Sequence, residues 1–320
     1  MADVNVRQRW WRVHARLLDA TAGVAIVVVL FLLFFLVVSG GQPLDPDYMV
    51  DSAWTLLPFL GVSIAATVIS FAIGLPIGFL VGWTRTLRGE PFRKLLARVR
   101  LPDEPMTTVQ RLRFRLWSAG AVAAAGIKRI LRRIADGYVE VMRGTPLFVQ
   151  ILFMWSLLIV EYPRLENLAF IAGVLALTAN TGGYQGEIFR AGLQTVHSGQ
   201  IEAARSIGLT RWGAMRHVVL PQALRLVSPP LLNEFIGLFK ASSLLYFIGV
   251  AELTSKYKQL ASFETRIFEL FAVVTILYLM FTVTLSQVVS YLERRYRIPG
   301  LGVEVPRGLV RRPGPPIAPA

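Results

Sequence analysis

Long apolar runs, separated by short charged stretches, dominate the sequence. A helix needs roughly 20 residues to cross a hydrocarbon core of about 30 Å. The candidate runs are, in order, 20–38, 56–83, 147–160, 168–189, 224–250 and 267–292. The third is short and would have to begin earlier, near Tyr138. The pattern predicts an all-α integral membrane protein with about six transmembrane helices.

Charge between the runs predicts the orientation in the membrane. Four arginines precede the run 20–38, whereas the connection 39–52 holds three aspartates and no Lys or Arg. Basic loops stay in the cytoplasm, so we expect both termini there. A basic stretch followed by an apolar run also resembles a signal peptide. The run 20–38 is longer than a typical signal-peptide core, which favours an uncleaved helix.

Composition narrows the possible functions. The chain has 320 residues, is 54% hydrophobic and carries a net charge of +14, but its basic residues lie between and beyond the apolar runs. That distribution suits a membrane protein and not a nucleic-acid partner. There is no cysteine, and the three histidines are scattered. We therefore predict no metal site and no catalytic residue.

The segment 85–137 is strongly basic, with thirteen Lys or Arg against four Asp or Glu. Its only apolar patch, Trp117 to Ile127, is too short and weak to span. One interpretation is a set of interfacial helices on the anionic inner leaflet. The other is a domain that docks a protein partner. The sequence favours contact with membrane lipid.

The segment 196–221 lies between two predicted spans and is too polar to cross. Ser198 is suited to begin a helix of about nine residues that Gly208 stops, and Thr210 is suited to cap a second helix ending at Leu220 and Pro221. This helix–turn–helix predicts a docking element inside the cell. An ordinary intracellular loop is the alternative.

Polar residues in or near the spans are candidates for a solute path, because each is costly in lipid without a partner or water. The candidates are Glu187, Arg190, Asn233, Glu234 and Lys240. Glu187 and Arg190 are three positions apart, so they can also simply pair with each other. Elsewhere, Gly74, Gly78 and Gly82 recur every four residues, which allows close helix packing. Pro229 and Pro230 predict an interruption of the run 224–250.

The docking segment resembles the coupling motif of ATP-binding cassette (ABC) importer permeases. The matching residues are Glu202, Ala203, Ala204, Gly208, Val218, Leu220 and Pro221. The resemblance implies that the short helix sits in a groove of a separate ATPase subunit. It also implies a permease core of the type I importer kind. No phosphate-binding loop occurs in the chain, so ATP and Mg are expected on the partner, and no cofactor on this chain.

Further motifs are similar to the permeases for polar amino acids of the histidine and glutamine type. They are Arg143-Gly144-Thr145-Pro146-Leu147 with Val149-Gln150, then Gly183-Tyr184, Glu187-Ile188, Arg190 and Gly192, and after the docking segment Pro221-Gln222-Ala223, Pro229-Pro230, Asn233 and Lys240-Ala241-Ser242-Ser243-Leu244. Ala241 departs from the family, which usually has an acidic or amide residue there. The basic segment 85–137 and the helix 20–38 are additions to its five-span plan.

The resemblance implies a bacterial inner-membrane permease that works with an ATPase dimer, a second permease subunit and a periplasmic solute-binding protein. The expected divisions are an N-terminal segment with the extra helix and outer loop (1–55), the first core helix (56–84), the basic insertion (85–137), the remaining core (138–292) and a cytoplasmic tail (293–320). An ion-coupled secondary transporter or channel is the main alternative, and a membrane enzyme is the third. Neither needs a docking segment for a nucleotidase.

Overall fold

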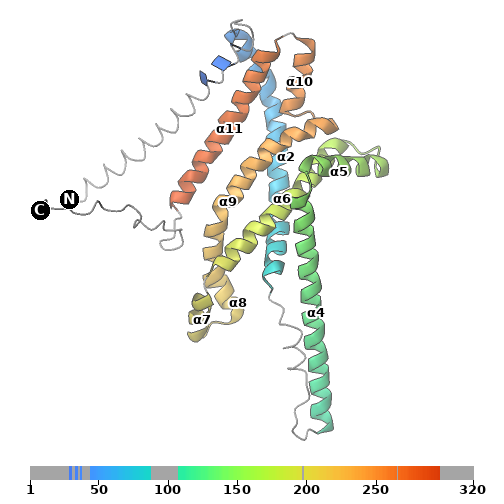
Figure 1. Cartoon of the computed structure of the whole chain (residues 1–320), viewed down its shortest axis with the longest axis vertical. Coiled ribbons are helices and arrows are strands. Elements are labelled where there is room, and N and C mark those ends of the chain that lie inside the picture. Colours follow the sequence, from blue (N-terminus) through green and yellow to red (C-terminus); the bar gives the residue numbers. More distant parts are fainter. Residues whose placement is uncertain are drawn as a thin grey trace, which may run out of the picture. The chain divides into compact units, whose positions relative to one another are not determined.

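The computed structural model describes residues 44–87, 107–196, 198–264 and 266–295, and five single positions between 29 and 37. Those ranges are helical, apart from short connections (Figure 1). The elements are α2 (Pro46–Thr86), α4 (Thr108–Gly144), α5 (Leu147–Glu161), α6 (Leu168–Thr195), α7 (Ser198–Ser206), α8 (Arg211–Ala214), η1 (Met215–Val219), α9 (Leu220–Ala241), η2 (Ser242–Ile248), α10 (Leu253–Phe263) and α11 (Ile267–Arg295). The all-α prediction is confirmed for the described ranges. The first predicted span, 20–38, lies largely outside them.

Three stretches in the described ranges are long and apolar enough to cross a membrane: Pro46–Thr86, Trp212–Ile248 and Ile267–Tyr291. They contain the predicted run 56–83 and most of the predicted runs 224–250 and 267–292. The predicted run 147–160 is α5, which has only 15 residues and follows α4 after a bend of 106°. α5 qualifies only together with α4. The number of spans therefore stays a prediction.

The sharp bend between α4 and α5 is held by side chains of the Thr145–Gln150 motif. Pro146 precedes α5 in an extended conformation. The Nε2 of Gln150 donates to the Met142 carbonyl at 2.9 Å and to Thr145 Oγ1 at 2.7 Å. Asn180 on α6 donates to the same carbonyl and to Gln150 Oε1, both at 3.0 Å. These amides satisfy a carbonyl at the end of α4 that has no partner within its own helix.

The described helices divide into two compact units, and α2, α4, α6, α9 and α11 contribute to both. The first unit comprises Met1–Gly74, Met142–Thr181 and Gly237–Thr282. Its core includes Ile151, Leu177 and Leu245 in one cluster, and Leu56, Leu253 and Leu270 in another. Every one of these six side chains is fully buried. Between membrane helices, the van der Waals contacts of such closely packed side chains stabilise the core, because lipid tails are as apolar as the side chains themselves.

Polar groups buried in this first unit are hydrogen-bonded. The fully buried Glu252 caps α10, because its carboxylate accepts from the backbone N–H of Thr254 at 3.0 Å and of Ser255 at 2.8 Å. It also accepts from Ser63 Oγ on α2 at 3.2 Å. Burial raises the pKa of Glu252, although these hydrogen bonds act in the opposite direction. The carboxylate therefore links α2 to the start of α10.

The second unit comprises Leu75–Val141, Gly182–Ile236 and Val283–Ala320. Its α2 and α6 segments approach so closely that only glycine fits. A Cβ at Gly82 would lie 2.7 Å from the Gly186 carbonyl oxygen, and one at Gly78 would lie 2.5 Å from the Gln185 Cβ. The close packing predicted from the glycine spacing is confirmed for Gly78 and Gly82. On the facing helix α6, the backbone of Gly186 lies opposite both glycines.

The predicted interruption at Pro229 and Pro230 is wrong, because α9 continues through both. A proline inside a helix leaves the carbonyl four residues earlier without its usual donor. For Pro229 that carbonyl belongs to Arg225, and Ser228 Oγ donates to it at 3.2 Å. The neighbouring serine thus gives that carbonyl a donor in place of the missing backbone N–H.

Candidate functional site

The first half of the docking segment has the predicted form. α7 spans nine residues, Ser198–Ser206, and Gly208 follows with a φ of +92°. The N–H of Gly208 donates to the Arg205 carbonyl at 3.1 Å, and that of Leu209 to the Ala204 carbonyl at 3.2 Å. This is the left-handed helix end that glycine adopts without strain. The stop predicted at Gly208 is confirmed.

The second half begins as predicted but does not end as predicted. Thr210 Oγ1 accepts the Gly213 N–H at 3.0 Å and so caps α8. The helix then continues through η1 into α9, so the expected end at Leu220 and Pro221 is wrong. η1 is a π-helical turn, with the Leu220 N–H bonded to the Met215 carbonyl. Its wider geometry directly before Pro221 accommodates a residue that would otherwise break the helix.

The segment has an apolar underside and an exposed outer face. Val196, Val219 and Ala223 form the buried cluster beneath it. Ala204 is also buried, at 5% exposure, so it serves the helix packing and not an outside partner. Exposed residues of the docking segment include Glu202, Ala203, Gly208, Trp212 and Pro221, and Ile207 is the most exposed of its large apolar side chains, at 80%. Ile207 and Trp212 therefore give this outer face apolar side chains as well as polar ones.

Glu187 and Arg190 pair with each other on α6, as the simpler interpretation predicted. The Glu187 carboxylate also pairs with Arg85, at the end of α2, and Arg85 Nε lies 2.7 Å from Asp136 Oδ1 on α4. The Arg85 side chain is only 12% exposed. This four-residue charge cluster joins three helices of the second unit. Arg85 and Asp136 were not predicted as members of the cluster, because the residues around each of them give no sign that the two side chains pair.

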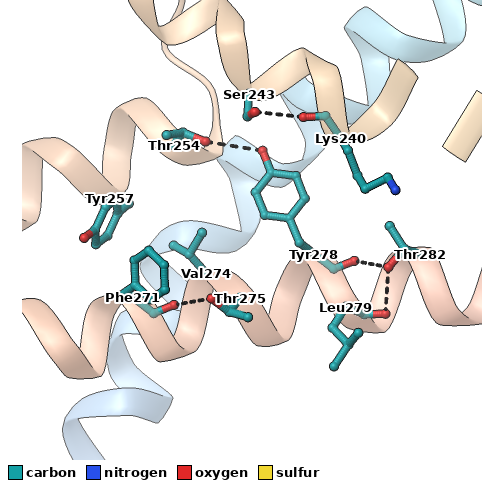
Figure 2. A pocket seen from close by; sticks show the side chains of 10 residues that line it. All are labelled: Lys240, Ser243, Thr254, Tyr257, Phe271, Val274, Thr275, Tyr278, Leu279 and Thr282. Atoms are coloured by element: carbon teal, nitrogen blue, oxygen red, sulfur yellow. Dashed lines mark hydrogen bonds between the residues drawn. The ribbon is translucent and has the colours of Figure 1, made fainter. Parts of the chain in front are cut away.

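Lys240, in the first unit, lines a cavity of about 450 Å³ (Figure 2). The walls come from α9, η2, α10 and α11, and the lining is Lys240, Ser243, Thr254, Tyr257, Phe271, Val274, Thr275, Tyr278, Leu279 and Thr282. Figure 2 shows the Lys240 side chain reaching past Tyr278 toward Thr282. Tyr278 Oη lies 3.3 Å from Thr254 Oγ1. One cation and several hydroxyls thus face an otherwise apolar space, and no acidic residue is among the ten.

The remaining predicted path residues lie on α9 in the second unit. Asn233 is exposed, and Glu234 is half-buried. Neither belongs to the lining of the cavity beside Lys240. Among the predicted path candidates, only Lys240 contributes to that cavity. Thr254 and Tyr278, two of its other polar members, were not predicted, because they lie beyond the motif 240–244 and belong to no recognisable pattern.

Comparisons with known proteins identify the family. A family model described as the inner membrane component of binding-protein-dependent transport systems matches residues 118–298. The glutamine transport system permease protein GlnP of Escherichia coli (strain K12) is 32% identical over 252 residues, which cover 78% of this chain and 97% of that protein. The chain belongs to the binding-protein-dependent transport permeases. The family match begins inside the segment 85–137 and leaves 85–117 outside it.

Solved structures agree with the family. A crystal structure of an amino acid ABC transporter with histidines has a chain that is 31% identical, with a TM-score of 0.61. The match covers 79% of this permease and 100% of that chain. A chain of the methionine transporter MetNI in an inward-facing conformation, 20% identical with a TM-score of 0.50, shares the fold. The permease therefore has the type I importer fold.

Family membership decides between the classes of function considered from the sequence. The permease is the transmembrane subunit of an ABC importer and not an enzyme, because the ATPase of these importers is a separate subunit. It is a multi-pass inner-membrane protein and works with an ATPase and a binding protein. An ion-coupled transporter is not supported.

Proposed function

We propose that the permease moves a polar amino acid, delivered by a periplasmic binding protein, into the cytoplasm. The observation that carries this proposal is Lys240 at the cavity of the first unit. The ammonium group of Lys240 provides a partner for a carboxylate, and the hydroxyls of Ser243, Thr275 and Thr282, which donate to backbone carbonyls, still offer acceptors for a polar side chain. The similarity to a glutamine permease and to an amino acid transporter supports the same class.

Docking of the ATPase dimer is assigned to the exposed face of α7, Gly208 and α8. ATP and Mg are bound on that partner, and the permease itself binds no cofactor. A second permease subunit, either a copy of this chain or a related one, completes the membrane part. Membrane lipid surrounds both. Gly208 fixes the direction in which the chain leaves α7, so it sets the shape that the ATPase subunit recognises.

The charge cluster of Arg85, Asp136, Glu187 and Arg190 has a separate role in this proposal. Its members already pair with one another, which leaves less of their charge for a substrate. We therefore assign them to holding α2, α4 and α6 together at the cytoplasmic boundary. Asn233 and Glu234 on α9 remain proposed path residues.

Substrate competition tests the proposed class. The permease, its ATPase subunit and its binding protein are reconstituted into proteoliposomes, and ATP-driven uptake of labelled glutamine is measured with excess unlabelled amino acids. Glutamine, histidine and other polar amino acids should compete, and leucine should not. Uptake that leucine blocks as well as glutamine does, or that a sugar blocks instead, would overturn the proposed class.

The proposed orientation has an independent test. A reporter that is active only outside the inner membrane should be silent when fused after Arg297 and active when fused near Asp47. This expectation rests on charge asymmetry, because the connection 39–52 contains no Lys or Arg whereas four arginines precede the first run. An active fusion after Arg297 would contradict the proposed cytoplasmic location of the C-terminus.

A further inference from the structure

An exposed apolar stripe runs along the first part of α4. Val109, Leu112, Leu116, Ile127 and Ile130 recur at intervals that place them on one side of the helix. They are between 57% and 67% exposed. No described element of the chain covers this stripe. Large apolar side chains in such a row mark an interaction surface.

Contacts near its C-terminal end fix the direction of α4 within the second unit. Asp136 pairs with Arg85, close to the end of α2. Two residues further along α4, the Tyr138 hydroxyl lies beside Gly182 and near Ile77, both earlier in their helices. α4 is therefore antiparallel to α2 and α6. Residues 108–134 continue past the charge cluster on the side where α6 leads into the docking segment.

The length of this extension decides what can cover it. α4 is one uninterrupted helix (Figure 1). At 1.5 Å per residue, Leu112 lies roughly 36 Å from Asp136 along the axis. Even an inclination of about 40° to the membrane normal leaves roughly 28 Å. The headgroup layer beyond the hydrocarbon core is only about 5–8 Å deep. With the charge cluster at the cytoplasmic boundary, lipid headgroups reach Arg132 and Arg133 but not Leu112.

We propose that the part of α4 from Val109 to Leu116 is a second contact of the permease with its ATPase subunit. This inference rests on the proposed docking of that subunit at α7 and α8, which lie on the same side. Between Thr108 and Ile134 the helix carries seven Lys or Arg and no acidic residue, and Arg113 and Arg115 flank the apolar stripe. The facing surface of the ATPase is accordingly an acidic-rimmed apolar groove. The leaflet interpretation from the sequence applies only to the basic turns nearest the membrane.

Site-specific photocrosslinking tests this contact. Because the chain has no cysteine, each single-cysteine variant carries the probe at one position only. A benzophenone maleimide is attached to Leu112→Cys, and the complete importer is then assembled in proteoliposomes and illuminated. Gln110→Cys is the matched control, because two residues along a helix turn the side chain by about 200° to the opposite face. Ile207→Cys, on the docking segment, reports the proposed docking independently.

The probe at Leu112 should label the ATPase subunit several-fold more than the probe at Gln110, and the probe at Ile207 should label it too. Labelling from Ile207 with only lipid or permease adducts from Leu112 would overturn the second contact and leave the docking intact. Equal labelling from Leu112 and Gln110 would also overturn it. Labelling from neither Leu112 nor Ile207 would contradict the docking as well.

Discussion

The docking segment and the cavity beside Lys240 differ in how their residues are spread along the chain. The docking segment is made by neighbours: Gly208 ends α7, and Thr210 caps the next helix three residues before Gly213. The cavity collects Lys240, Thr254 and Tyr278 from three helices. Local rules of helix start and stop therefore describe the first site. The second depends on how the helices pack.

The largest effect is expected where the local rule is strictest, at Gly208. Gly208→Asp places a side chain at a φ of +92° and a charge on the docking face. Left-handed backbone costs a non-glycine residue roughly 1–2 kcal/mol, although Asp tolerates it better than most. ATP-driven uptake should fall to background while the protein still inserts. Membrane vesicles and an immunoblot for membrane level measure both.

Gly208→Asn separates the two causes, because Asn accepts left-handed backbone without adding charge. It should keep more uptake than Gly208→Asp. Normal uptake by Gly208→Asp at a normal membrane level would break the comparison, since the docking segment would then not depend on its turn.

Packing between helices should give the next largest effect, on stability. A Cβ at Gly82 meets the Gly186 carbonyl and the Phe189 Cβ at under 3 Å, so Gly82→Val forces α2 and α6 apart. Overpacking of this kind typically costs about 1–3 kcal/mol. Gly61→Val is the matched control on the same helix, because nothing lies within 4 Å of its Cβ position. The midpoint temperature of thermal unfolding in detergent should fall clearly for Gly82→Val and not for Gly61→Val. Equal midpoints for the two variants would contradict the close approach of α2 and α6 at Gly82.

A moderate effect is expected at the cavity. Lys240→Met keeps the length of the side chain but removes the one charge from the lining. The concentration of amino acid for half-maximal uptake should rise about tenfold, the equivalent of ~1.4 kcal/mol. Lys256→Met on α10, outside the cavity, should leave it unchanged. If both variants behave alike, Lys240 does not contact the substrate.

Glu202→Ala should have the smallest effect, although the residue stands in the docking motif. Its side chain is exposed, and an ion pair that solvent reaches contributes about 0–1 kcal/mol. Uptake should therefore stay close to that of the unaltered permease. A loss as complete as that of Gly208→Asp would show that this carboxylate is buried in the complex.

The same division explains what could be predicted from the sequence. The long apolar helices α2, α6, α9 and α11, the end of α7 and the approach of Gly78 and Gly82 follow from short patterns and were predicted, whereas α10 was not. The helix continues through Pro229, although the sequence predicted an interruption there. The donor that Ser228 supplies to the Arg225 carbonyl depends on the side-chain geometry, which the sequence does not give. Arg85 and Asp136 are separated by a long basic connection, so their spacing in the sequence does not predict that they pair. Contacts between distant residues are set by packing, and the sequence pattern does not encode them locally.

The energy source tests the central claim most directly. Proteoliposomes are prepared with the permease alone, and with the permease, its ATPase subunit and its binding protein. Accumulation of labelled glutamine should require ATP and all of the components, and a proton or sodium gradient should not replace ATP. Gradient-driven accumulation by the permease alone would contradict the assignment and restore the ion-coupled transporter.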